Sequence, residues 1–124
     1  MLNWDNYPNF SEAEFACTHT GTCDMQEHFM DAIQELRTIY GKPMPITSGY
    51  RSPKHPIEAR KDKPGTHATG LAADIACSGQ DAYDILQIAF ELGFSGIGVQ
   101  QKGSARFIHL DMWEDGPRPN VWSY

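Results

Sequence analysis

Two histidines and one aspartate carry the clearest chemical signal in this sequence. His67 and Asp74 lie seven residues apart in the segment GTHATGLAADI (65–75), and His109 lies in the downstream segment FIHLD (107–111). Two imidazole nitrogens and one carboxylate oxygen, with a fourth position left open, form a ligand set typical of catalytic zinc. The residues therefore predict a small zinc hydrolase in which His67, Asp74 and His109 hold the metal ion.

The segments around these residues have the alternating pattern of β-strands, which predicts the side chains that share a face. Asp74 shares its face with residues that have almost no side chain, namely Gly70, Ala72 and Ala76. On the second strand, His109 shares a face with Phe107 and Asp111, while the opposite face carries Ile108, Leu110 and Met112. If the two strands are neighbours, Asp74 and His109 meet on one open surface. His67 then enters this surface from the turn before its strand.

Three helices are expected from capping signals and from the spacing of apolar residues. Ser11 and Glu14 form a capping-box pair that predicts a short helix over 11–16. Asp24 and Glu27 repeat this pattern ahead of a longer helix that ends at Gly41. Its apolar stripe consists of Met25, Phe29, Ala32, Ile33, Leu36, Ile39 and Tyr40. A third helix follows Ser78 and ends at Gly93, with an apolar stripe of Ala82, Ile85, Leu86, Ala89 and Phe90.

Four strands are expected over 44–50, 71–76, 96–100 and 106–112. Residues 51–65 contain Pro53, Pro56 and Pro64 and are expected to form a long loop, and a loop of this length favours a functional role. The tail 114–124 is rich in proline and glycine. This order of helices and strands predicts an α+β fold in a single domain over 1–124.

Composition narrows the classes of function. The net charge is −6, which disfavours nucleic-acid binding because that binding depends on neutralising phosphates. The sequence contains no run of 18 apolar residues, which is the length needed to span a membrane. Its first residues lack the pattern of a secretory signal. Three cysteines argue against a disulfide framework. A second zinc site at Cys17, His19 and Cys23 would lack a fourth ligand, so ordinary thiols in a turn are the favoured interpretation.

Four motifs, in this order along the chain, resemble those of the zinc D-alanyl-D-alanine carboxypeptidase family. They are SGYRSP (48–53), THATGLAAD (66–74), GFSGIGV (93–99) and FIHLD (107–111). Residues 9–17 are similar to the family's N-terminal segment, and Trp122 is similar to its late tryptophan. The closest group looks like the small zinc peptidases of bacterial cell walls and phages. The resemblance implies a hedgehog/DD-peptidase-like fold, with helices packed on a small, mostly antiparallel sheet, a Zn²⁺ cofactor and peptidoglycan stem peptides as substrate.

The resemblance also implies roles for individual residues. His67, Asp74 and His109 match the family's zinc ligands. Arg51 matches the arginine that contacts the substrate or the developing oxyanion, a task that suits a permanently charged guanidinium. The residues expected to line the substrate pocket are Tyr50, Ser52 and His55. The basic side chains of the 51–65 loop could meet the carboxylates of an acidic stem peptide, although a solvated loop is an equal alternative.

The general base is the point at which the chain departs from the family pattern. Better-known relatives carry an Asp or Glu three residues before the last zinc histidine, and here that position is Arg106. Asp111 is the first candidate because it shares the face of His109, and its alternative role is to orient that histidine. Glu114 is the second candidate, with an exposed acid in the tail as its alternative.

The predicted function is zinc-dependent hydrolysis of amide bonds in peptidoglycan stem peptides, by a D,D-carboxypeptidase or an endopeptidase. The alternatives are an inactive wall-binding or virion structural module with the same fold, and a purely structural zinc site. The bond that is cut stays open. We expect a monomer that is made in the cytoplasm and acts on the cell wall after release or delivery. The compact chain, with no signal or wall-binding module, favours a phage-type origin.

Overall fold

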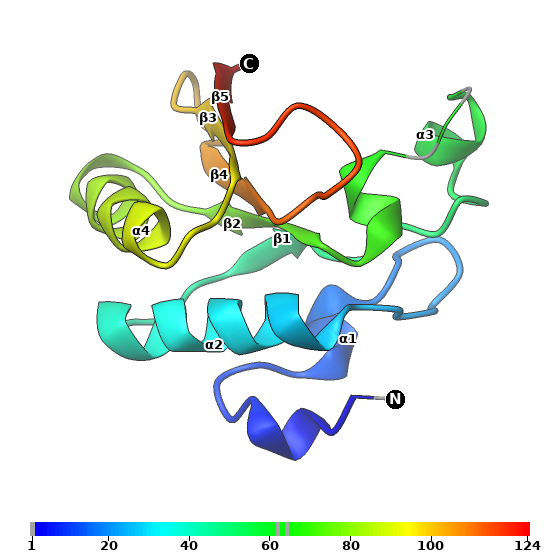
Figure 1. The fold of residues 1–124 in the computed structure, drawn as a ribbon, viewed down its shortest axis with the longest axis horizontal. Coiled ribbons are helices and arrows are strands. Elements are labelled where there is room, and N and C mark those ends of the chain that lie inside the picture. The colour runs from blue at the N-terminus through cyan, green and yellow to red at the C-terminus, as the bar shows by residue number, and fades with distance from the viewer. Residues whose placement is uncertain (1, 62, 64) are drawn as a thin grey trace.

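The computed structural model describes residues 2–61, 63 and 65–124 and shows an α+β fold (Figure 1). Pro64, expected in the long loop, lies outside the described residues. The helices are α1 (Glu12–Phe15), α2 (Glu27–Tyr40), α3 (Pro56–Ala59) and α4 (Gly79–Glu91). The strands are β1 (Ile46–Ser48), β2 (Ala72–Ala76), β3 (Gly96–Gln100), β4 (Phe107–Asp111) and β5 (Asn120–Ser123). Two 3₁₀ turns, η1 (Trp4–Asn6) and η2 (Thr66–Thr69), complete the order.

The five strands form one sheet in the order β1-β2-β4-β3-β5. Three of the four pairings are antiparallel, and only β3 with β5 is parallel. The sheet is therefore mostly antiparallel, as expected. The central pair, β2 with β4, sets Asp74 directly opposite His109.

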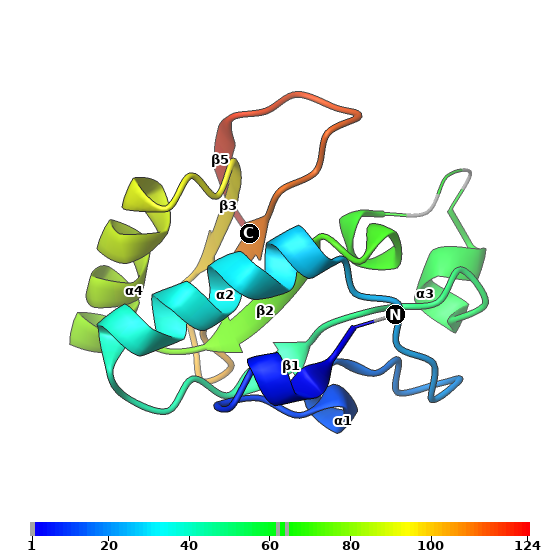
Figure 2. The ribbon, with the colours of Figure 1, turned by 60° about the horizontal axis from the view of Figure 1, so that its bottom comes forward.

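Helices α2 and α4 pack together and cover one face of the sheet (Figures 1 and 2). The face they cover carries the apolar side chains that the alternation predicted for the interior, among them Ala73, Ile75, Ile108 and Leu110. The opposite face carries Asp74, His109 and Asp111. Burying one face in this way, at about 25 cal/mol per Å² of apolar surface, fixes the strand register and so fixes the position of the polar side chains.

Helix α1 has the predicted capping box between Ser11 and Glu14. Helix α2 ends at Gly41 in the left-handed conformation, as predicted. It begins at Glu27 rather than at the Asp24 signal, because the backbone of Gln26 is extended, and the N–H of Gln26 donates to the carbonyl of Gly70 at 3.0 Å. This bond fixes residues 24–26 against the turn before β2. Among the described residues, the structure contains no helix long and apolar enough to cross a membrane.

Two segments contain regular structure that the sequence pattern did not predict. The 51–65 segment includes the short helix α3, which His55 caps by accepting a hydrogen bond from Ile57 N–H at Nδ1. The tail forms β5, a parallel edge strand whose residues pair with 96–99. The placement of Phe90 in the apolar stripe of α4 was wrong, because its side chain is exposed. The buried line of α4 runs through Ala82, Ile85 and Ala89, and residue 90 lies beyond its edge.

Candidate metal centre and its cleft

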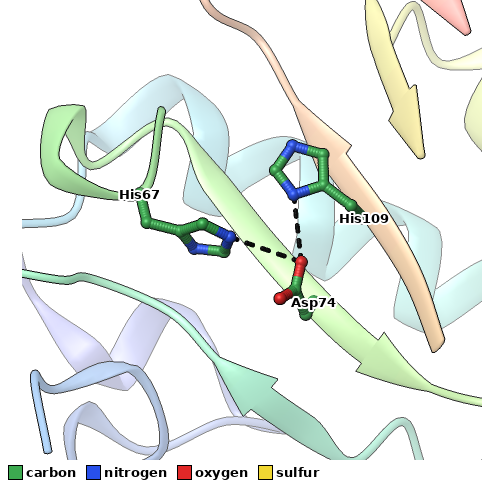
Figure 3. A group of neighbouring side chains, drawn as sticks. All are labelled: His67, Asp74 and His109. Atoms are coloured by element: carbon green, nitrogen blue, oxygen red, sulfur yellow. Dashed lines mark hydrogen bonds and ion pairs between the residues drawn. The ribbon is translucent and has the colours of Figure 1, made fainter. Parts of the chain in front are cut away.

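His67, Asp74 and His109 converge on one point on the open face of the sheet (Figure 3). One ligand atom from each residue lies within 4.8 Å of the other two. Asp74 Oδ1 lies 3.4 Å from His67 Nε2 and 3.0 Å from His109 Nδ1. The two rings therefore point their nitrogens at the same carboxylate oxygen from different sides. Two imidazoles and a carboxylate are a donor set that suits zinc and leaves a fourth position for water or substrate.

Three different elements position these ligands. Asp74 lies in the middle of β2, and His109 lies opposite it in β4. His67 lies in η2, which ends at Gly70 with a positive φ of 76°. A Cβ atom at Gly70 would lie 2.1 Å from the carbonyl oxygen of Asp24. Gly70 therefore allows the tight turn from η2 into β2 and a close contact with residue 24, and it does not form part of the surface around Asp74.

The outer nitrogen of each imidazole donates a hydrogen bond to a fixed acceptor. His67 Nδ1–H donates to the carbonyl oxygen of Gly49 at 2.9 Å. His109 Nε2–H donates to Asp111 Oδ2 at 2.7 Å. In the neutral rings these bonds place the proton on the outer nitrogen, so His67 Nε2 and His109 Nδ1 are free to bind a metal ion. When a ring also carries a proton on its inner nitrogen, that nitrogen donates to Asp74. Outer partners of this kind orient metal-binding histidines and raise their basicity.

Asp111 is fully buried, and both of its oxygens are engaged. Arg118 donates to them from Nε and Nη2, at 2.8 Å each, and Trp113 N–H donates to Oδ1 at 3.2 Å. A Cβ atom at Gly96, the neighbour of Asp111 across the sheet, would lie 2.1 Å from Asp111 Oδ1. Glycine at position 96 thus makes room for this carboxylate. A buried carboxylate with four donors fits the orienting role better than that of a general base.

Electrostatic effects within this cluster favour charged carboxylates. Burial alone would raise the pKa of Asp74, but hydrogen bonds from His109 and His67 outweigh it and hold that pKa well below its usual range. Burial of Asp111 is likewise outweighed by hydrogen bonds from Arg118 and His109, which lower its pKa. Burial lowers the pKa of His109, but its hydrogen bonds with Asp111 and Asp74 raise it overall. Without a metal ion, Asp74 is thus a carboxylate anion that faces two imidazole rings, and these three groups are the ligands that a metal cation would bind.

The metal centre opens into a cleft of about 400 Å³. Its other walls come from the loop after β1 and from the tail, and they include Arg51, Glu58, Lys61, Thr66, Trp122 and Tyr124. Trp122 packs over Gly98, where a Cβ atom would lie 2.6 Å from the indole nitrogen, and its ring centroid is 5.3 Å from that of His109. Parallel pairing of β5 with β3 therefore brings an aromatic wall to the metal centre.

The other candidate site residues named from the sequence lie at different places, and some of them do not line the cleft. Arg51 lines both this cleft and a second cavity of about 370 Å³, which Tyr50 and His55 also line. Ser52 is buried and accepts a hydrogen bond from Lys54 N–H, and it lines neither cavity. Glu114 is an exposed acid that lies 3.7 Å from His28 and does not line the cleft. Its position fits the alternative that the sequence left open.

Three residues of the site were not singled out from the sequence, namely Arg118, Glu58 and Tyr124. Arg118 pairs with Asp111, and Glu58 is a buried carboxylate that pairs with Arg51 and Lys61. Glu58 did leave a signal, because it is one of only two acids in the basic 51–65 segment. The second zinc site considered at Cys17, His19 and Cys23 is not found among the described residues, where the only metal-competent cluster is His67, Asp74 and His109.

Comparison with known proteins gives one family match. The model of the Peptidase M15 family matches residues 8–111, which is most of the chain and includes all three candidate ligands. No curated protein matched this chain in the comparison. The match ends at Asp111, so β5 and Trp122 lie outside it.

Proposed function

Because the chain belongs to the Peptidase M15 family of zinc metallopeptidases, we propose that it hydrolyses amide bonds in the stem peptides of peptidoglycan. One observation carries the proposal. In their neutral form, both histidines are held in the tautomer whose free nitrogen faces Asp74, one by the Gly49 carbonyl and the other by Asp111. These two histidines and Asp74, with an open fourth position, are the arrangement of a catalytic rather than a structural zinc site.

Different residues of the cleft have different roles in the proposed reaction. A zinc ion on His67, Asp74 and His109 would lower the pKa of a bound water and polarise the scissile carbonyl. Arg51 presents a permanent positive charge beside the ligands and stabilises the negative charge that develops on the carbonyl oxygen. Asp111 holds His109 in place rather than accepting the water proton. Tyr124 presents its phenol at the cleft, where it serves as a hydrogen-bond donor to substrate.

We further propose that the substrate is an acidic stem peptide. The chain acts as a monomer on the cell wall, after release or delivery. Arg51 and Lys61 supply positive charge at the cleft for the peptide's carboxylates. Hydrolysis of a terminal bond would make the protein a D,D-carboxypeptidase, and hydrolysis of an internal or cross-link bond would make it an endopeptidase.

A second candidate function is a wall-binding module with the same fold and no hydrolytic activity. It is favoured because neither of the described carboxylates that line the cleft, Asp74 and Glu58, is free to act as a general base. Asp74 is a metal ligand, and Glu58 is enclosed by donors. Neither is placed to accept a proton from water.

The test uses purified protein, its zinc content and the clearing of a peptidoglycan suspension. We expect about one zinc per chain and clearing, with both lost in His67→Ala. His28→Ala, which removes an exposed imidazole elsewhere, serves as the matched control and should retain both. One zinc per chain without any release of wall peptides would refute the peptidase and support the binding module. No bound zinc in the wild type would refute the metal centre itself.

A further inference from the structure

Glu58 is a buried carboxylate at the edge of the cleft, and its side chain has no exposed surface. It lies in α3, on the segment between the arginine of the cleft and the first metal ligand. A buried carboxylate costs several kcal/mol unless it is paired and hydrogen-bonded. Its contacts therefore indicate what it is for.

Three donors surround this carboxylate. Arg51 Nη1 donates to Oε2 at 3.2 Å, Lys61 Nζ donates to Oε2 at 2.9 Å, and the backbone N–H of Gly65 donates to Oε1 at 2.6 Å. Burial would raise the pKa of Glu58, but the hydrogen bonds from Lys61, Gly65 and Arg51 outweigh it and lower that pKa. The group is therefore an anion near neutral pH, and protein donors occupy both of its oxygens.

The contact with Arg51 fixes the direction of the guanidinium. One terminal nitrogen is held by Glu58 in α3, and the other donates to Ser48 Oγ in β1 at 3.2 Å. The backbone N–H of Arg51 donates in turn to the carbonyl oxygen of His67 at 3.1 Å. Arg51 is thus tied to the strand on one side, to α3 on the other and to a metal ligand through its backbone.

The contact with Gly65 ties the same carboxylate to the ligand turn. Gly65 caps η2, two residues before His67. A Cβ atom at position 65 would lie 2.9 Å from Lys61 Nζ and 3.2 Å from Glu58 Oε1, so glycine allows this close approach. Glu58 therefore joins the segment that carries Arg51 to the turn that carries His67.

We propose that Glu58 is a positioning residue that aims the Arg51 guanidinium into the cleft at a fixed distance from the metal centre. Its effect on the reaction rests on the proposed function, whereas its effect on Arg51 does not. Without its anionic partner, the guanidinium keeps one hydrogen bond within the described part of the chain, to Ser48, and can turn away from the substrate. The remaining carbonyl oxygen of a glutamine cannot hold two cations and a backbone N–H in the same way.

The first experiment is a double-mutant cycle between Glu58 and Arg51, in which the measured quantity is the rate of peptide release from peptidoglycan. We expect Glu58→Gln to lower kcat/KM by about 10²-fold, mainly through kcat, with zinc content unchanged. In the Arg51→Gln background the same change should cost less than about 2-fold, because Glu58 acts through Arg51. Equal losses in both backgrounds would overturn the proposal. Asp81→Asn, which breaks the exposed ion pair with Lys42, is the control for loss of a carboxylate.

The second experiment needs no activity and separates this proposal from the proposed function. In metal-free protein, ¹⁵N NMR should show distinct guanidinium resonances for Arg51 in the wild type and averaged resonances in Glu58→Gln. Glu58→Asp keeps the charge but has a side chain shorter by one methylene, so its Arg51 resonances should be partly averaged. This variant replaces Glu58→Gln if the glutamine variant does not fold. If the wild type hydrolyses nothing, the peptidase proposal fails and the NMR result still decides the role of Glu58. Unchanged Arg51 resonances in folded variants would overturn it.

Discussion

At the scale of single residues, the metal ligands and Arg51 depend on charged partners that are not themselves metal ligands. Asp111 connects His109 to Arg118, and Glu58 connects Arg51 to Gly65. The three ligands themselves could be predicted from residue type, spacing and strand alternation. Strand alternation also placed Asp111 on the face of His109. Arg118 and Glu58 could not be predicted, because the sequence alone does not show that a charged residue in a loop or tail is buried by the fold.

The Asp111 interaction makes a quantitative prediction. Asp111→Asn keeps the shape of the side chain but removes the charge that orients His109 and pairs with Arg118. We expect zinc affinity to fall by about 10- to 100-fold, measured by competition with a chromogenic chelator. Asp81→Asn should leave the affinity unchanged. If Asp111→Asn bound zinc normally yet lost all hydrolysis, Asp111 would be the general base rather than the orienting residue.

The lowered pKa of Glu58 predicts how stability depends on pH. A carboxylate whose pKa is lower in the folded state adds stability above its unfolded pKa, near 4.5, and this stability is lost as the pH falls through the folded pKa. The free energy of unfolding of the metal-free wild type should therefore fall more steeply than that of Glu58→Gln between about pH 7 and pH 3. The other acids are common to both proteins and cancel in the comparison. Parallel curves would mean that the ion pairs with Arg51 and Lys61 do not form in solution.

At the scale of elements, glycines allow the close contacts on which the site depends. Gly96→Ala would place a methyl group 2.1 Å from Asp111 Oδ1. We expect a loss of about 1–3 kcal/mol in unfolding free energy and a weaker zinc affinity, measured by thermal denaturation and by metal titration. Gly103→Ala is the control, because its Cβ would meet open space and only the positive φ of 74° opposes it. It should cost stability without changing zinc affinity, and an unchanged Gly96→Ala variant would contradict the packing described around Asp111.

Comparing the predicted elements with the observed ones shows why some parts of the fold could be predicted from the sequence and others could not. Helix α2 and strands β2, β3 and β4 each combine a regular apolar period with a clear end signal. Strand β5 has only four residues in a segment rich in proline and glycine, and it forms because β3 offers an unpaired edge. Helix α3 is one turn long and depends on the buried Glu58 contacts rather than on an apolar stripe. Such elements are fixed by tertiary contacts, which a local pattern does not contain.

At the scale of the whole molecule, the sheet separates two tasks. One face packs against α2 and α4 and provides the core, and the other face carries the metal ligands and the cleft. The α+β class and this division could be predicted, because alternation along β2 and β4 assigns each side chain to a face. The shape of the cleft could not be predicted, since it depends on where the loop after β1 and the tail fold back over the sheet.

Metal binding should stabilise the whole fold, because the ligands come from η2, β2 and β4. At a free zinc concentration about 100 times the dissociation constant, the expected gain is about 2.7 kcal/mol. Chelation should therefore lower the Tm of the wild type and leave that of His109→Ala unchanged. An equal shift in both proteins would place the bound metal elsewhere.

The most direct test of the central claim is mass spectrometry of peptidoglycan after digestion with the zinc-loaded protein. We expect new stem-peptide termini that appear with the wild type and are absent with His109→Ala, and their masses identify the bond that is cut. Unchanged peptidoglycan, from a protein shown to carry one zinc per chain, would contradict the central claim.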